Sequence, residues 1–392
     1  MPSGSQTRRQ FSTERLRVIV TDGEGVGTLA AVRALRSAGY AVWTAAQHPH
    51  AYAARSRAVM GTVPTRDPRR DQDGFASDLA REAARLGAAV VLPGSEIALL
   101  ALTHNVGAFP DAVTLGVCKP DVVRRATDKS ALAEHAAAAG LIPPPTAVVR
   151  ATKIDAREVS LPAVVKPLRS EMLVGGAFRH TSARRIETST ELRSAVRNLP
   201  GCVGLVQPYL PGRLIAVSGI FWDGEMICAI HQSSSRIWPV DCGTISYAET
   251  VSPDRRLERG TARLLLNLGW RGLFQLQFIE SAGHMYLIDL NPRIYTSLAL
   301  AVAAGVNLPA IWVDLLLGHK PSTIDGYRVG VRYRHEEHDP RSLLAALKER
   351  RIGTVLHGAL PHRRTTHAVF KLEDPTPLLT SLSKIKRKAV YS

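Results

Sequence analysis

The sequence predicts an α/β domain with a parallel, doubly wound sheet at the N-terminal end, followed by a region of the α+β class. Between Arg17 and about Lys119, buried-type strands alternate with a glycine loop and helices, which is the pattern of parallel βα units. Beyond that point, strands are joined by tight turns such as Trp222-Asp223-Gly224, which is typical of antiparallel hairpins. With 392 residues, the chain is long enough for two or three domains.

The first elements are expected in the order strand, glycine loop, helix and strand. A strand is predicted over Arg17–Asp22, an amphipathic helix from about Thr28 to Ala38, and further strands over Ala41–Ala46 and Ala88–Leu92. The glycines at 23, 25 and 27 have the spacing G-x-G-x-G, and no acidic residue ends the second strand. A tight βα turn is therefore a better interpretation than a dinucleotide site.

Glu96 follows the strand that ends at Leu92, at the sheet edge where open α/β sheets meet their ligands. Its carboxylate could hold a substrate amine, or it could simply cap the next helix, as Ser95 also could. The capping role is the preferred interpretation.

The segment 273–293 is predicted to form a hairpin that carries convergent polar side chains. Its strands run from Leu273 to Glu280 and from His284 to Leu290. The metal-ligand candidates are Gln277, Asp289 and Asn291. Asp289 and Asn291 leave the same face of the second strand, and the hairpin register can bring Gln277 beside them. One carboxylate and two amide oxygens suit Mg²⁺ that takes its other ligands from triphosphate and water. The same run of residues, read alone, is equally compatible with a simple turn.

This hairpin resembles the metal-binding hairpin of the ATP-grasp superfamily, in which an acid or Gln on one strand is followed by an acid, an Asn and an Arg that close the next. The Gln variant, and the run Ser-Leu-Ala-Leu-Ala from Ser297, resemble the carbamoyl-phosphate synthase large-subunit branch. The resemblance covers roughly Arg17 to Gly318. It implies a Rossmann-like N-terminal domain followed by a two-lobed ATP-grasp domain. The expected divisions are a tail over 1–16, the Rossmann-like domain over 17–119, the ATP-grasp domain over 120–325 with its lobes split near 205–212, and a basic C-terminal lobe over 326–392.

The resemblance also implies roles for individual residues. Lys129 and Lys166 would contact ATP phosphates, and the loop 168–181 would fold over the triphosphate. Arg293 would hold an acyl phosphate, and Arg236 could do so or could be a surface residue. The hinge that meets adenine is expected at Gln207, Pro208, Tyr209 and Leu210. The acid that many relatives use to hold ribose is not evident near this hinge.

The implied activity is an ADP-forming carbon–nitrogen ligase that uses ATP and Mg²⁺, with Mn²⁺ as an alternative ion. It would activate a small carboxylic acid as an acyl phosphate and join it to an amine. Two alternatives stay open. One is a carbamoyl-phosphate-type or other phosphoryl-transfer enzyme, favoured by Gln277. The other is a non-catalytic nucleotide-binding or basic interaction protein, suggested by the net charge of +16 and the missing ribose acid.

Composition and local sequence patterns indicate the cellular compartment of the protein and the partners it is expected to have. Four cysteines with no close pairing and no metal-ligand spacing indicate a reducing compartment, and the predicted location is the cytoplasm. The apolar segment Leu298–Gly318 is interrupted by Asn307 and Pro309, so two buried helices are expected rather than a membrane span. The basic residues are not interleaved with aromatic side chains, so a nucleic-acid partner is disfavoured. A homodimer is left open.

Overall fold

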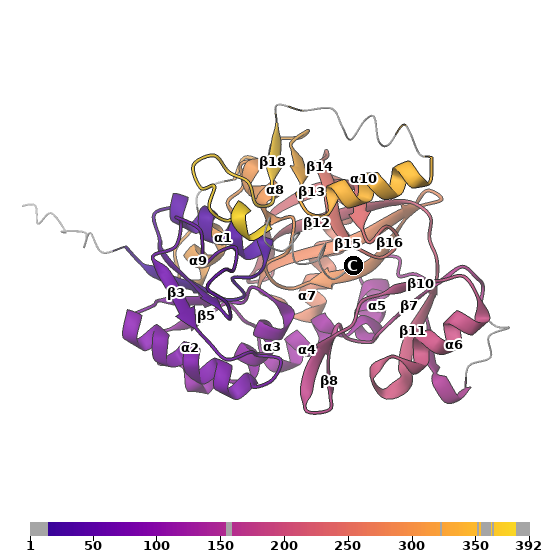
Figure 1. Ribbon diagram of the computed structural model, residues 1–392, viewed down its shortest axis with the longest axis horizontal. Coiled ribbons are helices and arrows are strands. Elements are labelled where there is room, and N and C mark those ends of the chain that lie inside the picture. Colours follow the sequence, from indigo (N-terminus) through magenta and orange to yellow (C-terminus); the bar gives the residue numbers. More distant parts are fainter. Residues whose placement is uncertain are drawn as a thin grey trace, which may run out of the picture.

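The computed structural model describes residues 15–153, 159–321, 324–350, 353, 362 and 364–381. Three parts surround a common centre, an N-terminal α/β domain, a small antiparallel lobe and a large antiparallel sheet (Figure 1). The fold is thus mixed α/β and α+β, as the sequence predicts.

The N-terminal domain holds a five-stranded parallel sheet in the order β3-β2-β1-β4-β5. Because the first strand is central and the order reverses beside it, helices cover both faces, which is the doubly wound arrangement. The elements are β1 (Arg17–Val20), α1 (Val26–Ser37), β2 (Ala41–Ala46), β3 (Gly61–Pro64), α2 (Gln72–Leu86), β4 (Val90–Leu92), α3 (Glu96–His104), a 3-10 turn (Val106–Ala108) and β5 (Thr114–Leu115). The expected boundary at Lys119 falls between β5 and the next helix.

A pair of helices leads into the small lobe, which is built on a four-stranded antiparallel sheet in the order β10-β7-β11-β6. A separate small core under α6 supports this sheet. The elements are α4 (Pro120–Thr127), α5 (Lys129–Ala138), β6 (Ala147–Arg150), β7 (Ala163–Lys166), β10 (Arg184–Ile186), α6 (Ser189–Arg197) and β11 (Val203–Pro208), with 3-10 turns at Ala151–Lys153 and Pro200–Cys202.

The segment 168–181, expected as a flexible loop, instead contains a hairpin of β8 (Glu171–Val174) and β9 (Ala177–His180). Gly175 and Gly176 both have positive φ, at 58° and 81°, which is the backbone of a tight two-residue turn. The hairpin rests on the N-terminal domain, since the Phe178 N–H donates to the Arg69 carbonyl at 2.7 Å. The Gly-Gly pair between two short strands was the sequence signal for this structure.

The large sheet has seven strands in the order β16-β15-β12-β13-β14-β17-β18. Neighbouring residues of β15 point to opposite faces, so Leu273 joins the core with α8 and α9 while Phe274 joins the core with α4, α5 and α7. Its elements are β12 (Arg213–Trp222), β13 (Glu225–Trp238), β14 (Thr244–Thr250), α7 (Arg255–Leu268), β15 (Gly272–Ser281), β16 (His284–Asn291), α8 (Leu298–Ala303), α9 (Leu308–Leu316), β17 (Arg332–Arg334), α10 (Asp339–Lys348) and β18 (Thr365–His367).

The two helices α8 and α9 agree with the expected break at Asn307, whose side chain caps α9 by accepting from the Ala310 N–H at 3.2 Å. Within the described ranges, no helix is both long enough and apolar enough to cross a membrane.

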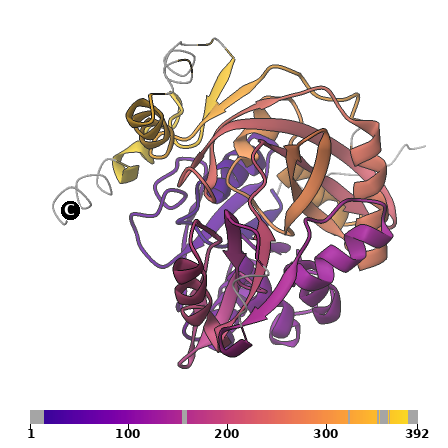
Figure 2. The same ribbon diagram turned by 90° about the vertical axis from the view of Figure 1, so that its right-hand side faces the viewer.

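The described residues of the region 326–392, expected as a basic C-terminal lobe, include β17 and β18, which extend the large sheet. The chain then returns to the N-terminal domain (Figure 2). There the Asp374 carboxylate pairs with Arg33 at 2.8 Å. Most of the expected tail over 1–16, and the basic run Lys384–Lys388, lie outside the described residues.

Candidate functional site

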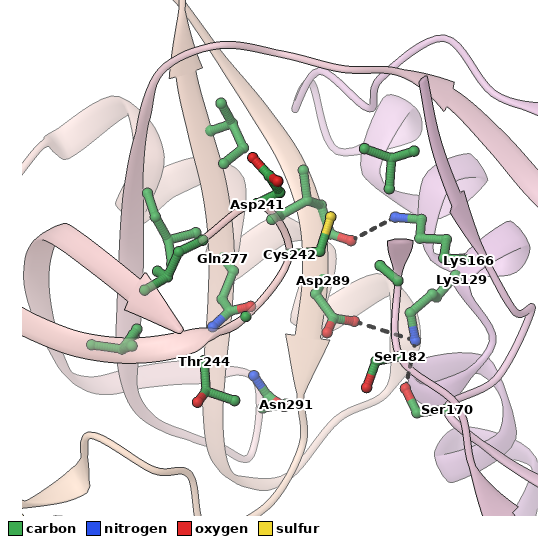
Figure 3. Close-up of a pocket in the computed structure, with 18 of the residues that line it drawn as sticks. Lys129, Lys166, Ser170, Ser182, Asp241, Cys242, Thr244, Gln277, Asp289 and Asn291 are labelled. Carbon is green, nitrogen blue, oxygen red and sulfur yellow. Dashed lines mark hydrogen bonds and ion pairs between the residues drawn. The ribbon is translucent and has the colours of Figure 1, made fainter. Parts of the chain in front are cut away.

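A cavity of about 440 Å³ lies between the small lobe and the large sheet. It gathers residues from α5, β7, β11, β15 and β16, elements that are far apart in the sequence. The predicted site residues that line it are Lys129, Lys166, Gln207, Pro208, Tyr209, Leu210, Gln277, Asp289, Asn291 and Arg293. Figure 3 shows the lysines on one side of this cavity and the polar residues of the β15–β16 hairpin on the other.

The β15–β16 hairpin places the candidate metal ligands through its register. Gln277 pairs directly with Asp289, and Gln275 pairs with Asn291. A bulge between Gln277 and Phe278 interrupts the ladder next to this pair. Bulges of this kind re-aim side chains beside functional sites. The amide of Asn291 is held on both sides, because its Nδ2 donates to Gln275 Oε1 at 3.3 Å and its Oδ1 accepts from Arg293 Nη2 at 3.1 Å.

The donor set of this hairpin fits a hard cation better than a transition metal. Its three side chains offer one carboxylate and two amide oxygens, and the side chain of Asp289 is 30% exposed toward the cavity. No group of three His, Cys, Asp or Glu residues within the described ranges could hold a metal ion. Oxygen ligands with one charge suit Mg²⁺ that shares its coordination with phosphate and water.

Lys129 is the first residue of α5, and its position is set by the helix start. Asp128 caps α5 by accepting from the backbone N–H groups of Ser130 and Ala131. The Lys129 N–H donates to the Leu168 carbonyl at 2.9 Å, which ties the helix start to the segment just after the strand that carries Lys166. Its Nζ lies 2.8 Å from Ser170 Oγ and 3.7 Å from Asp289 Oδ1.

Lys166 ends β7 and is almost wholly buried at 6% exposure. Its Nζ donates to the Ile288 carbonyl at 3.1 Å, next to Asp289 in the chain (Figure 3). Burial lowers the pKa of Lys166 to about 8, the nearby Asp289 carboxylate partly offsets this, and Lys129 adds to it. A buried ammonium group that gains only a carbonyl and a distant carboxylate is short of anionic partners, and a phosphate would supply them.

The end of β11, which pairs with β7 in the sheet of the small lobe, forms a further part of the cavity wall. The Gln207 side chain donates to Thr146 Oγ1 at 2.8 Å, and the Tyr209 N–H donates to the Pro162 carbonyl at 2.9 Å. Since that N–H is used within the protein and Pro208 has none, a bound base would have to use carbonyl groups or Leu210. Arg185 lies over the Tyr209 ring at 4.2 Å and stiffens this wall.

Arg236 does not take the position expected for it. It is absent from the cavity lining and lies buried, with its Nε 2.5 Å from Asp339 Oδ1 and its guanidinium 4.0 Å above the Tyr247 ring. β13 bends at irregularities on either side of Arg236, and α10 supplies the acid that pairs with it. Its role in this structure is to join β13 to α10.

Some cavity residues were not singled out from the sequence. Asp241 lines the cavity near the hinge, half exposed and paired with Arg185 at 3.0 Å, so an acid is present on the hinge side after all. Gln275 is buried behind Asn291 and bonded to Ser218 and Ser297 at 3.3 Å. The signal for Gln275 was its place two residues before Gln277 on the same strand face. Asp241 lies in a connection and gave no comparable signal.

The sequence is similar to one protein family and to several curated proteins. Residues 203–338 match the family described as ATP-grasp in the biosynthetic pathway with Ter operon. The large chain of carbamoyl phosphate synthase from Clostridium botulinum (strain Loch Maree / Type A3) is 29% identical over 190 residues. That match covers 47% of this chain but only 17% of the relative, and the same enzyme from Clostridium perfringens (strain SM101 / Type A) is 28% identical over the same length.

Several solved structures share the fold over most of the chain. An L-amino acid ligase from Bacillus licheniformis superposes with a TM-score of 0.62 at 15% identity, covering 81% of this chain and 78% of its own. N5-carboxyaminoimidazole synthetase from Staphylococcus aureus gives a TM-score of 0.62 at 12% identity and covers 82% of each chain. A biotin carboxylase from Campylobacter jejuni gives 0.60 at 15% identity, with 82% of this chain and 75% of its own covered. At these identities the likeness establishes the fold alone.

Proposed function

Because this chain belongs to the ATP-grasp superfamily, we propose that it is an ADP-forming carbon–nitrogen ligase acting on a small carboxylic acid and an amine. The observation that carries the proposal is the meeting of Lys129 and Lys166 with the Asp289 hairpin across one cavity. That arrangement would surround a triphosphate with two cations and a magnesium site.

The chain's residues would act by position and charge. Lys129 and Lys166 would orient the phosphates and offset the charge that develops during phosphoryl transfer. Gln277, Asp289 and Asn291 would hold Mg²⁺, which when bound draws charge from the phosphate oxygens. Arg293, fixed by Asn291 Oδ1 and the Ile294 carbonyl, would face the carboxyl group being activated.

The reaction has two steps. A carboxylate oxygen attacks the γ-phosphorus, the bond to the bridging oxygen breaks, and ADP leaves. The amine nitrogen then attacks the acyl carbon, phosphate leaves, and the nitrogen gives up a proton. On the hinge side, Asp241 is the acid best placed to meet the ribose hydroxyls.

A phosphate-release screen of amino-acid and hydroxy-acid pairs, with mass detection of the condensed product, tests this proposal. We expect ADP and phosphate to appear only when an acid and an amine are both present, in equal amount to the condensed product. ATP binding without turnover under every pair would instead favour a non-catalytic nucleotide-binding protein.

Carbamoyl-phosphate-type chemistry is the second candidate, because Gln277 stands where most of the superfamily is expected to carry an acid and because the matched relatives are carbamoyl phosphate synthases. In that case ADP would form with bicarbonate and ammonia alone. The same screen separates the two candidates when it includes wells without any organic acid.

A further inference from the structure

A second cavity of about 240 Å³ opens beside the nucleotide cavity. It lies between the loop after β1, the start of α3, the β8–β9 hairpin and the segment after β16. The residues that line both cavities are Glu96, His180, Arg293, Tyr295 and Thr296. A molecule in the second cavity can therefore reach toward the site where phosphoryl transfer is proposed.

Two glycine residues allow the walls of this cavity to approach each other closely. A Cβ atom on Gly27 would lie 2.4 Å from the Tyr295 carbonyl oxygen, and one on Gly94 would lie 2.0 Å from the Thr21 carbonyl oxygen. Both positions thus allow backbone contacts that any side chain would block. Gly27 accordingly serves the contact between the N-terminal domain and the segment after β16.

Two buried carboxylates line the second cavity, and each has a buried oxygen with no hydrogen-bond partner among the described residues. Glu96 is 9% exposed and its Oε1 makes no hydrogen bond. Glu171 is 5% exposed, and its Oε1 meets Arg69 Nη2 at 2.9 Å and His180 Nδ1 at 3.2 Å, while its Oε2 makes no hydrogen bond. Buried oxygens of this kind are costly unless a donor reaches them.

The surroundings of these carboxylates favour a cation. Asp22 also lines the cavity. Burial, and repulsion from Glu24, raise the pKa of Asp22 to about 6. Burial raises the pKa of Glu96 as well, against the opposing effect of Lys129 and Arg293. A cationic group placed between these carboxylates would relieve both the desolvation and the repulsion.

The end of the second cavity near the β15–β16 hairpin carries a positive charge, that of Arg293. Arg293 donates through Nη1 to the Ile294 carbonyl at 2.7 Å and through Nη2 to Asn291 Oδ1 at 3.1 Å. Its buried Nε has no partner among the described residues. A carboxylate is the acceptor that a guanidinium group binds best.

We propose that the second cavity binds an amino acid as the acid substrate, with its ammonium group against Glu96 and Glu171 and its carboxylate at Arg293. This inference rests on the proposed ligase function and names the substrate class of that site. It follows that the carboxylate lies at the junction of the two cavities, where the γ-phosphate would be delivered. The same molecule's ammonium group has no lone pair, and attack by its nitrogen on its own acyl carbon would close a three-membered ring, so the attacking amine comes from a second molecule.

Thermal shift measurements test the binding without requiring turnover. The parent protein, saturated with Mg²⁺ and ADP, is titrated with each proteinogenic amino acid and with the matched 2-hydroxy acid, in which a hydroxyl replaces the ammonium group. We expect at least one amino acid to raise Tm and its hydroxy acid to have no comparable effect. In Glu96→Gln, which keeps size and shape, the concentration for a half-maximal shift should rise about tenfold or more, the loss expected for one charge-assisted hydrogen bond.

Glu134→Gln is the matched control, because Glu134 is an exposed carboxylate on α5 that lines neither cavity. Its titration should equal that of the parent. The proposal is overturned if no amino acid shifts Tm, if the hydroxy acids act equally, or if Glu96→Gln responds as the parent does. Amino-acid binding with no ATP turnover in the screen above would leave the amino-acid site standing and defeat the proposed function, and with it the role of that amino acid as substrate.

Discussion

Lys166 is the residue where burial and charge are most clearly opposed. Its ammonium group is 6% exposed and has one carbonyl partner, and its pKa falls to about 8. Relative to the ordinary lysine pKa of 10.5, this shift corresponds to about 3 kcal/mol against the charged form. When an anion binds beside such a group, its attraction for the ammonium charge is expected to offset this cost in the free energy of folding.

Replacing Lys166 by Met should abolish nucleotide binding and leave the fold intact or more stable. The methionine fills a similar space, and it removes a buried charge whose hydrogen-bond partner among the described residues is the Ile288 carbonyl. Thermal unfolding with and without MgATP measures both effects at once. A variant that is stabilised by MgATP as strongly as the parent would show that Lys166 does not contact the phosphates.

The affinity for MgATP should decrease as pH rises above about 8. Phosphate binds the protonated form of Lys166, and the unliganded protein loses that proton near its lowered pKa of about 8. The dissociation constant should therefore rise about tenfold between pH 7 and pH 9. In Lys166→Arg, whose charge persists, the constant should be flat over this range, and a flat profile in the parent would contradict the account.

Raising the pH should have opposite effects on folding and on MgATP binding: through Lys166 it increases the stability of the folded chain, whereas it weakens MgATP binding. The pKa of Lys166 is lower in the folded than in the unfolded chain, so the unfolded chain binds more protons between the two values. This residue therefore reduces stability fully below pH 8, and the reduction fades as pH rises toward 10.5.

At the scale of elements, the β15–β16 hairpin shows how much the sequence could predict. Alternation places Asp289 and Asn291 on one face, which is a local property, as were the strands of the N-terminal sheet. The turn register alone, in which Ser281 pairs with His284, would place Gln277 opposite Ile288, and the bulge after Gln277 shifts the pairing by one residue to Asp289. The bulge after Gln277 could not be predicted, because it depends on how β15 also pairs with β12.

The position of Arg236 could not be predicted for a different physical reason. The sequence leaves two interpretations open, an acyl-phosphate contact and a surface residue, whereas its side chain on β13 is buried and pairs with Asp339, on a helix 103 residues later. Nothing in the local pattern of β13 indicates that helix. The β8–β9 hairpin, by contrast, was within reach of sequence reasoning, because Gly175 and Gly176 sit between two short strands.

Changes to the hairpin ligands should separate charge from geometry. Asp289→Asn should raise the magnesium concentration for half-maximal ADP formation more than Gln277→Ala does, because Asp289 supplies the only negative charge among the proposed ligands. Water can replace the neutral Gln277 oxygen, but it cannot replace a charge. Equal increases, or a larger one for Gln277→Ala, would place the metal elsewhere.

At the scale of the whole molecule, the described C-terminal segment joins the large sheet to the N-terminal domain. The Asp374 carboxylate accepts from Arg33, Ser56 and the Arg57 N–H, and these bonds lower its pKa against the opposing effect of burial. The stability it contributes is present above the ordinary pKa of 3.8 and is lost as pH falls through the lowered value.

Asp374→Asn should reduce the free energy of unfolding by about 3–5 kcal/mol, the range for removing one partner of a buried ion pair. The side chains of Arg33 and Asp374 are 12% and 8% exposed, so the loss is not screened by solvent. Urea unfolding at neutral pH measures it. Glu373→Gln is the control, since that neighbouring side chain is 76% exposed, and it should change stability by less than about 0.5 kcal/mol. Equal effects of the two substitutions would mean that the Asp374 contacts do not hold the domains together.

Oxygen transfer from the acid substrate to phosphate tests the central claim, activation of a carboxylate as an acyl phosphate, most directly. The enzyme is incubated with ATP, Mg²⁺, amino acids labelled with ¹⁸O in their carboxylates, and an unlabelled amine, and the released phosphate is analysed by mass spectrometry. The account predicts one ¹⁸O atom in each phosphate formed with the parent protein, and no labelled phosphate with Lys166→Met. Release of unlabelled phosphate at the full rate would contradict it, because the phosphoryl group would then have gone to water or to another acceptor.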